Sequence, residues 1–183
     1  MRYLIDSNVF FHKIKEDILT VAKSCKKNNC GMYVSPAILN ELEAPKKSGY
    51  SNDCYNIVNS CVYGVLSEYK FIQLAELSAD ARREYQKIRN KYYRWTLDPR
   101  YLRSLIEKNI LTEEDVKKVR YKDIGECELL AIAKTSKSDH YIVTDDFGKV
   151  YLHPEQNVFD FYKNDPKINI LKSDEWLDDI KLE

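Results

Sequence analysis

Short apolar segments that end directly in acidic residues are the feature that most constrains this chain. Tyr3-Leu4-Ile5 runs into Asp6-Ser7-Asn8, and the segment over residues 140–144 runs into Asp145-Asp146. Each pattern is typical of a buried strand that carries polar groups at its carboxyl end. The sequence between such segments has helical spacing, for example over residues 15–27 and 126–133. This alternation predicts an α/β fold, in which helices cover both faces of a central, mostly parallel sheet.

Three further strands, over residues 31–35, 71–74 and 168–171, and a helical insertion complete the predicted organisation. Residues 31–35 and 71–74 have the pattern of strands, and Ser35-Pro36 predicts the start of a helix that Pro45 should end at about Ala44. Residues 78–122 are helical, polar and aromatic instead, and Thr112 with Asp115 resembles a capping box. The length predicts a single domain over 1–183, with a helical, basic and aromatic insertion at about 78–122.

The composition excludes several classes of protein. The 29 basic and 29 acidic residues give a formal net charge of zero, so overall charge favours neither a nucleic-acid nor a membrane partner. No apolar run approaches the roughly 20 residues that span a bilayer, and Asp6 comes too early for a signal peptide. We therefore expect a cytoplasmic protein with no membrane partner. The five cysteines include no CxxC pair and predict neither a disulfide framework nor a zinc site.

Carboxylates from four parts of the chain are predicted to gather at one edge of the sheet, because functional groups of parallel sheets lie at the carboxyl ends of the strands. Taken singly, Glu126 can cap its helix and Glu41 can be a solvated helix residue. Together, clustered carboxylates repel and desolvate one another unless a hard cation such as Mg²⁺ or Mn²⁺ binds them. The candidates are Asp6, Glu41, Glu126, Glu128, Asp145 and Asp146.

Four motifs, in order, resemble those of PIN-domain nucleases. Residues 3–10 (YLIDSNVF) resemble the opening motif, in which hydrophobic residues precede Asp-Thr/Ser-Asn-Val, and residues 34–41 (VSPAILNE) resemble the second, a strand and Ser before a helix that bears Glu. Residues 125–133 (GECELLAIA) resemble the third motif in its Gly-Glu-x-Glu variant, and residues 143–146 (VTDD) the fourth, Thr-x-Asp. The set covers the chain from residue 3 to about 150 and implies a PIN-like three-layer α/β/α fold.

The resemblance also implies roles for individual residues. Asp6, Glu41, Glu128 and Asp146 would be the four catalytic, metal-binding carboxylates, since the spacing from Glu128 to Asp146 suits the third and fourth family positions. Position 128 carries Glu where Asp is more common, so the choice between Glu126 and Glu128 stays open. The implied supporting residues are Asn8, Thr144, Glu126 and Asp145.

Such a site predicts a Mg²⁺- or Mn²⁺-dependent endonuclease that hydrolyses phosphodiester bonds, with RNA as the expected substrate. Divalent ions can activate a water and stabilise the attacking and leaving oxygens, and none of the three histidines lies in an HExxH or Ser/His/Asp arrangement. Because the family includes toxins paired with an antitoxin, and dimers, the resemblance implies an antitoxin protein and a homodimer as candidate partners. The extra length at 78–122 suits a stand-alone nuclease equally.

Residues 82–103 combine basic and aromatic side chains, which is typical of a surface that binds phosphates and stacks on unpaired bases. A solvated basic helix and a partner-binding surface are the alternatives. The predicted nucleic-acid-binding residues are Arg82, Arg83, Lys87, Arg89, Lys91, Tyr92, Arg94 and Trp95.

Two other functions compete with the nuclease. A phosphatase of the haloacid-dehalogenase kind also begins with a strand leading into Asp, but it needs a second Asp two residues later, where this chain has Asn8. A non-catalytic binding module of the PIN fold is the other rival. The intact acidic set argues against it, because a scaffold has little reason to keep uncompensated carboxylates together.

Overall fold

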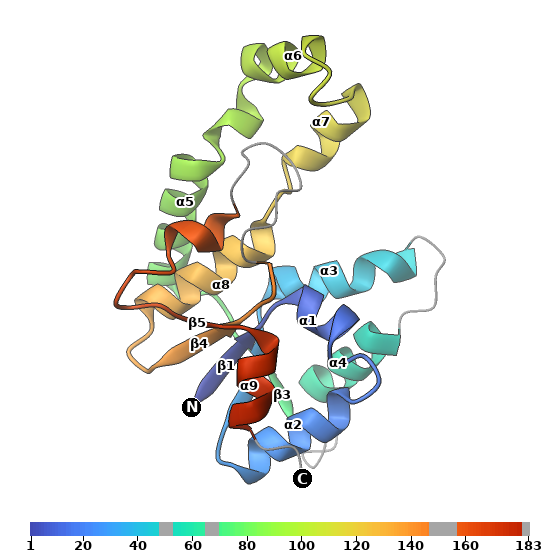
Figure 1. Ribbon diagram of the computed structural model, residues 1–183, viewed down its shortest axis with the longest axis vertical. Coiled ribbons are helices and arrows are strands. Elements are labelled where there is room, and N and C mark those ends of the chain that lie inside the picture. The colour runs from blue at the N-terminus through green and yellow to red at the C-terminus, as the bar shows by residue number, and fades with distance from the viewer. Residues whose placement is uncertain (48–52, 65–69, 147–156, 181–183) are drawn as a thin grey trace.

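A parallel sheet forms the centre of the molecule. The computed structural model describes residues 1–47, 53–64, 70–146 and 157–180 (Figure 1). Within these ranges five strands pair in the order β3-β2-β1-β4-β5, and every pair is parallel. The strands are β1 (Arg2–Ile5), β2 (Gly31–Val34), β3 (Ile72–Leu74), β4 (His140–Val143) and β5 (Asn169–Leu171). The predicted parallel sheet is confirmed.

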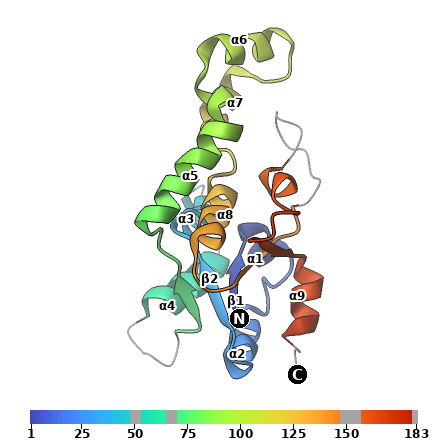
Figure 2. The ribbon, with the colours of Figure 1, turned by 90° about the vertical axis from the view of Figure 1, so that its left-hand side faces the viewer.

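Helices cover both faces of the sheet, which confirms the three-layer α/β/α architecture (Figures 1 and 2). On one face α2 (Ile18–Lys27) and α4 (Asp53–Tyr63) pack against each other and against β2 and β3, and α9 (Ser173–Asp179) joins them. On the other face α8 (Ile124–Thr135) packs on β4 and is covered by α5 (Ala79–Tyr92). No described helix has both the length and the apolar character needed to cross a membrane.

The register of the two central strands places the ends of β1 and β4 side by side. Leu4, Ile5, Ile142 and Val143 are fully buried, as expected of strands covered on both faces. Ile5 lies opposite Val143, and the backbone N–H of Asp6 donates to the Val143 carbonyl at 3.0 Å. The chain order reverses between β1 and β4, and such switch points are where open α/β sheets bind ligands.

The insertion projects from this body as a helical extension (Figures 1 and 2). After α5, the chain forms η2 (Arg94–Leu97), α6 (Pro99–Glu107) and α7 (Glu113–Val119), which we call the helical arm. A separate small hydrophobic cluster holds the arm together. The capping box of Thr112 and Asp115 at the start of α7 is confirmed.

Two local features differ from the sequence-based expectation. Helix α3 (Pro36–Lys47) continues through Pro45, which the sequence pattern predicts to end it. A proline this near the carboxyl end removes only one intrahelical hydrogen bond, so the last turn can still form. Helix α1 (Ser7–His12) is absent from the sequence-based expectation, and it begins because the Asp6 side chain caps it.

Candidate active site

Asp6 is the centre of the predicted acidic site. Its side chain is buried where β1 ends, and both carboxylate oxygens accept hydrogen bonds. Oδ1 accepts from the backbone N–H of Ser7 at 2.7 Å. Oδ2 accepts from the Asn8 amide at 2.8 Å and from the Thr144 hydroxyl at 2.7 Å. These bonds fix the carboxylate orientation at the edge of the sheet.

Thr144 joins the end of β4 to this carboxylate. Its Oγ1 donates to Asp6 and accepts from the backbone N–H of Asp146 and from the Asn8 amide, each at 3.2 Å. The side-chain oxygen Oδ1 of Asn8 accepts a hydrogen bond from the backbone N–H of Asp145 at 3.3 Å. The predicted supporting residues Asn8 and Thr144 therefore hold Asp6 and Asp146 next to each other.

Glu41 reaches the same place from α3. Its Oε2 accepts a hydrogen bond from the Ser7 hydroxyl at 2.7 Å, and the backbone N–H of Gly125 also donates to it. A Cβ at position 125 would come within 2.6 Å of Glu41 Oε1 and 2.5 Å of Ile38 Cδ1. Only glycine therefore allows the start of α8 to approach the Glu41 carboxylate this closely.

Glu126, in the first turn of α8, lies close enough to Asp6 and Glu41 for their negative charges to act on it. Burial raises the pKa of Glu126 well above its ordinary value, and the negative charges of Asp6, Asp123 and Glu41 raise it further. Burial is also the main cause of the raised pKa of Asp6, to which Glu41 and Asp146 add. The pKa of Glu41 is raised by the same effects, with Asp123 and Glu128 as its acidic neighbours.

Two predicted members of the set turn toward structural partners instead. Glu128 Oε2 accepts the backbone N–H of Ala37 at 2.9 Å, at the amino-terminal end of α3. Asp145 accepts from the backbone N–H and hydroxyl of Ser173, at 3.0 and 2.6 Å, at the start of α9. Both carboxylates thus satisfy N–H groups that begin helices.

Three carboxylates of the acidic group, those of Asp6, Glu41 and Glu126, form no salt bridge within the described part of the chain. The described residues also contain no group of three His, Cys, Asp or Glu side chains already arranged to chelate a metal. The donor chemistry nevertheless fits a hard divalent cation, because carboxylate oxygens are what Mg²⁺ and Mn²⁺ bind.

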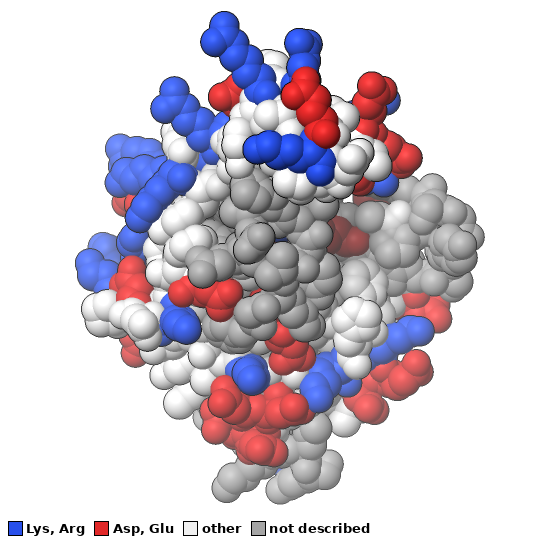
Figure 3. All heavy atoms as spheres, turned by 45° about the horizontal axis from the view of Figure 1, so that its top comes forward, with Lys and Arg blue, Asp and Glu red and all other residues white. Residues whose placement is uncertain are grey.

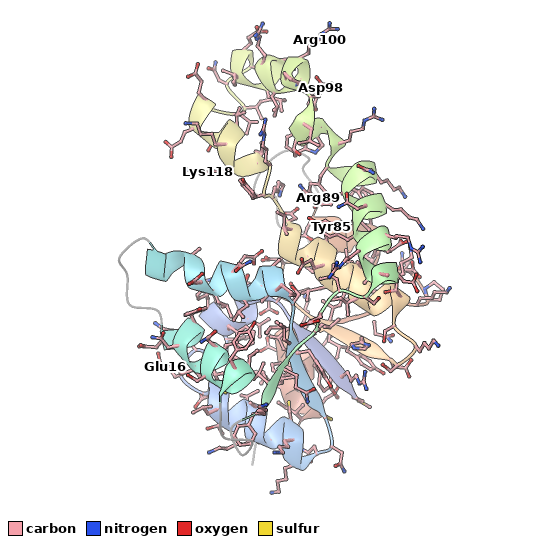
Figure 4. The ribbon with its side chains drawn as sticks, turned by 180° about the vertical axis from the view of Figure 1, so that it is seen from behind. Glu16, Tyr85, Arg89, Asp98, Arg100 and Lys118 are labelled. Carbon is pink, nitrogen blue, oxygen red and sulfur yellow. The ribbon has the colours of Figure 1, made fainter. Side chains whose placement is uncertain are left out.

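The connection between the arm and α8 borders this group, and sequence reasoning missed it. Asp123 adopts a left-handed backbone conformation (φ 51°) and accepts a hydrogen bond from the Tyr93 hydroxyl at 2.5 Å. Lys122 Nζ lies 3.0 Å from its other oxygen. Arg89, on the side of α5 that faces this connection (Figure 4), donates to the carbonyls of Lys122 and Arg120.

The predicted nucleic-acid-binding residues divide into exposed cations and packed side chains. The exposed cations are Arg82, Arg83, Lys87, Lys91 and Arg94. Figure 3 shows Lys and Arg side chains gathered on the side where α5 lies. Tyr92 stacks on Phe161 with ring centroids 4.5 Å apart, and Trp95 meets Tyr101 edge to face in the arm cluster. Arg89 has the structural contacts described above.

Comparison with known proteins finds solved structures to which this chain is similar. No family model and no curated protein matches the sequence. The VapBC2 structure from Rickettsia felis bound to a promoter DNA fragment is 13% identical, with a TM-score of 0.47 over 94% of this chain and 98% of that chain. DNA-bound VapBC from Salmonella typhimurium is 14% identical, with a TM-score of 0.48 and the same coverage. VapBC-1 from nontypeable Haemophilus influenzae is 11% identical, with a TM-score of 0.40 over 80% of this chain and 87% of that chain.

Proposed function

We propose that this chain is a divalent-metal-dependent endoribonuclease of the PIN type. The observation that carries the proposal is the convergence of carboxylates from distant segments at the switch point between β1 and β4. Asp6 ends β1, Glu41 comes from α3, Glu126 from α8, and Asp146 follows β4. No Lys or Arg of the described residues forms a salt bridge with the first three. A bound divalent cation would reduce the electrostatic repulsion between these carboxylates.

The four carboxylates would hold Mg²⁺ or Mn²⁺, and a bound ion would supply an activated water and stabilise the charge on phosphodiester oxygens. The chain positions these carboxylates: Thr144 and Asn8 orient Asp6, and Ser7 orients Glu41. We assign the third position to Glu126, because Glu128 is bonded to the start of α3. The motif leaves the choice between Glu126 and Glu128 open, and the hydrogen bond of Glu128 to Ala37 supports Glu126.

Replacement of Asp6 by Asn tests the proposal directly. The Asn side chain keeps the shape of Asp but loses the charge that binds the cation, so we expect Mn²⁺- or Mg²⁺-dependent cleavage of RNA to fall to background. Circular dichroism and thermal unfolding should show an intact fold. Full activity of Asp6→Asn would reject the mechanism.

A pair of variants tests the third carboxylate. Glu126→Gln should lose cleavage as Asp6→Asn does, whereas Glu128→Gln should keep measurable cleavage because its hydrogen bond to Ala37 can be made by an amide oxygen. The reverse result would assign the role to Glu128, as the motif resemblance implies.

The rival functions have their own tests. A phosphatase should turn over p-nitrophenyl phosphate, and a nuclease should not; Asn8 already bonds to Asp6 and Thr144 where that reaction needs a second Asp. A binding module need not bind Mn²⁺, so calorimetric titration of wild type against Asp6→Asn separates it from the enzyme.

Exposed cations along α5 support a nucleic-acid substrate, and the motif resemblance implies that this substrate is RNA. Cations that contact phosphates release counterions, so binding should weaken steeply as salt is raised. Equal affinity and cleavage of single-stranded DNA would remove the preference for RNA. An antitoxin and a homodimer stay predictions of the motif resemblance, and the molar mass of the chain purified alone and with its co-expressed neighbour tests both.

A further inference from the structure

A polar cleft lies beside the acidic group. It has a volume of about 560 Å³ and is lined by the start of α3, the segment after β3, and one face each of α5 and α8. Its lining includes Pro36, Leu77, Arg82, Tyr85, Gln86 and Glu128. Nothing in the mechanism proposed above uses this cleft.

The cleft adjoins the elements that carry the proposed active site at one residue, Glu128 of α8. This side chain lines the cleft, and it lies one helical turn after Gly125, whose backbone N–H donates to Glu41. Its bond to Ala37 ties it to the first turn of α3, the helix that also carries Glu41. The cleft is therefore placed to receive the part of a chain molecule that flanks the acidic group.

The side chains of α5 in the cleft suit a nucleotide. Arg82 is exposed, and its Nε donates to the Leu77 carbonyl at 3.2 Å, which orients the guanidinium beside the cleft. Tyr85 is half-buried on the side of α5 that faces α8 (Figure 4), and Gln86 is exposed one helical turn after Arg82. A guanidinium binds phosphate oxygens, and a tyrosine ring gives a flat surface for an unpaired base.

The remaining lining favours a base over an anion alone. Pro36 and Leu77 provide apolar walls, and Gln86 and Glu128 offer hydrogen-bonding groups to the edge of a base. Glu76 and Glu128 both line the cleft, and their charges would repel a second phosphate. The charges therefore favour one phosphate on Arg82 and one base against Tyr85.

We propose that this cleft holds the unpaired nucleotide next to the scissile phosphodiester, with its base on Tyr85 and its phosphate on Arg82. The proposal rests on the proposed nuclease function and adds where the flanking part of the substrate lies. It makes Arg82 and Tyr85 substrate-binding residues that do not touch the reacting atoms.

Binding to an inactive protein tests the cleft separately from cleavage. In the Asp6→Asn background, a fluorescein-labelled single-stranded RNA octamer of mixed sequence should bind about tenfold more weakly to Arg82→Ala and to Tyr85→Leu, because each loses one charged or stacking contact. Tyr85→Phe keeps the ring and should bind like its parent. Arg2→Ala removes an exposed arginine from the start of β1, at the opposite end of this strand from Asp6, and is the matched charge control.

The active protein supplies the second readout. Arg82→Ala and Tyr85→Leu should raise KM about tenfold with kcat within about twofold, since they remove binding beside the bond and not at it. Binding by Arg82→Ala and Tyr85→Leu equal to the parent would overturn the cleft proposal, as would an equal loss in Arg2→Ala. If wild type cleaves no RNA with either metal while octamer binding still depends on Arg82 and Tyr85, the nuclease proposal fails and the nucleotide cleft stands. If wild type cleaves RNA and neither variant changes KM, the cleft proposal fails and the nuclease proposal stands.

Discussion

The α/β body and the helical arm differ in how much apolar structure holds them together. In the body, one continuous cluster includes residues of the sheet and of the helices on both of its faces, and its central strands are fully buried. In the arm, the buried cluster consists of Leu102, Leu105, Leu111 and Val119 with a few half-buried neighbours. Because hydrophobic stabilisation grows with the apolar area removed from water, the arm should open far more easily than the body.

The acidic group lies in the region that we expect to be the more stable of the two. Three buried or half-buried carboxylates with raised pKa values destabilise the fold around them, and only a large core can offset that cost. Functional sites in strained surroundings depend on structure elsewhere in this way. The arm contributes no member of the acidic group, so its opening need not disrupt the site.

Two leucine-to-alanine substitutions give the largest expected contrast. Leu130 is fully buried in α8, and Leu130→Ala should lower the free energy of unfolding of the whole protein by about 2–5 kcal/mol. Leu105 is nearly as buried in α6, but Leu105→Ala should cost no more than the arm's own stability, since the arm can unfold alone. Chemical denaturation measures the first effect, and amide exchange over residues 99–119 measures the second.

Equal losses of global stability in the two variants would contradict this comparison. They would mean that the arm and the body unfold as one cooperative unit.

Metal ions and pH should change the stability of the body and leave the stability of the arm unchanged. Burial raises the pKa of Asp6 to about 7, above its value in the unfolded chain, so the native state binds more protons between about pH 4 and about pH 7. The free energy of unfolding of the metal-free protein should therefore fall as pH rises through this range. Mn²⁺ should offset the loss, and its stabilising effect should grow with pH because it competes with protons for the carboxylates.

Thermal unfolding at about pH 5 and about pH 8, with and without Mn²⁺, measures this linkage. Asp6→Asn should weaken both the pH dependence and the stabilisation by Mn²⁺. Amide exchange in α6 should be unchanged by the metal, and an equal protection of the arm would show that the two regions are coupled.

The sequence predicts the parts of the site that depend on local pattern. The apolar runs that lead into Asp6 and into Asp145-Asp146 predict two buried strands. In a parallel sheet the carboxyl ends of these strands lie at the same edge. The choice between Glu126 and Glu128 depends instead on where a distant helix begins, because the bond from Ala37 to Glu128 joins residues 91 positions apart. No periodicity within α8 contains that information.

The same limit applies to Asp145, which pairs with Ser173 across 28 positions, and to Glu41, which Ser7 orients across 34. The glycine at position 125 is visible in the motif, but its need for close contact with Glu41 is a property of helix packing. Tertiary contacts, and not local propensity, decide which partner each of these carboxylates binds.

The smallest expected effect concerns the junction between the two regions. Tyr93 is buried at the end of α5, and its hydroxyl donates to Asp123, which precedes α8 and adds its charge to the group around Glu126. Tyr93→Phe removes this one hydrogen bond to a charged acceptor, at an expected cost of about 1–2 kcal/mol in the free energy of unfolding. Lys122 still pairs with Asp123, so the fold should survive.

If the junction positions the site, Tyr93→Phe should also shift the pH profile of cleavage, because Asp123 would no longer be held at its present place beside Glu41 and Glu126. Tyr121→Phe, a change to a tyrosine that is 73% exposed in the same connection, should alter neither stability nor the profile. A loss of stability in Tyr93→Phe with an unchanged pH profile of cleavage would mean that the junction has only a structural role. It would then connect the arm to the body without any influence on the acidic group, and the two regions would be independent in function as well as in stability.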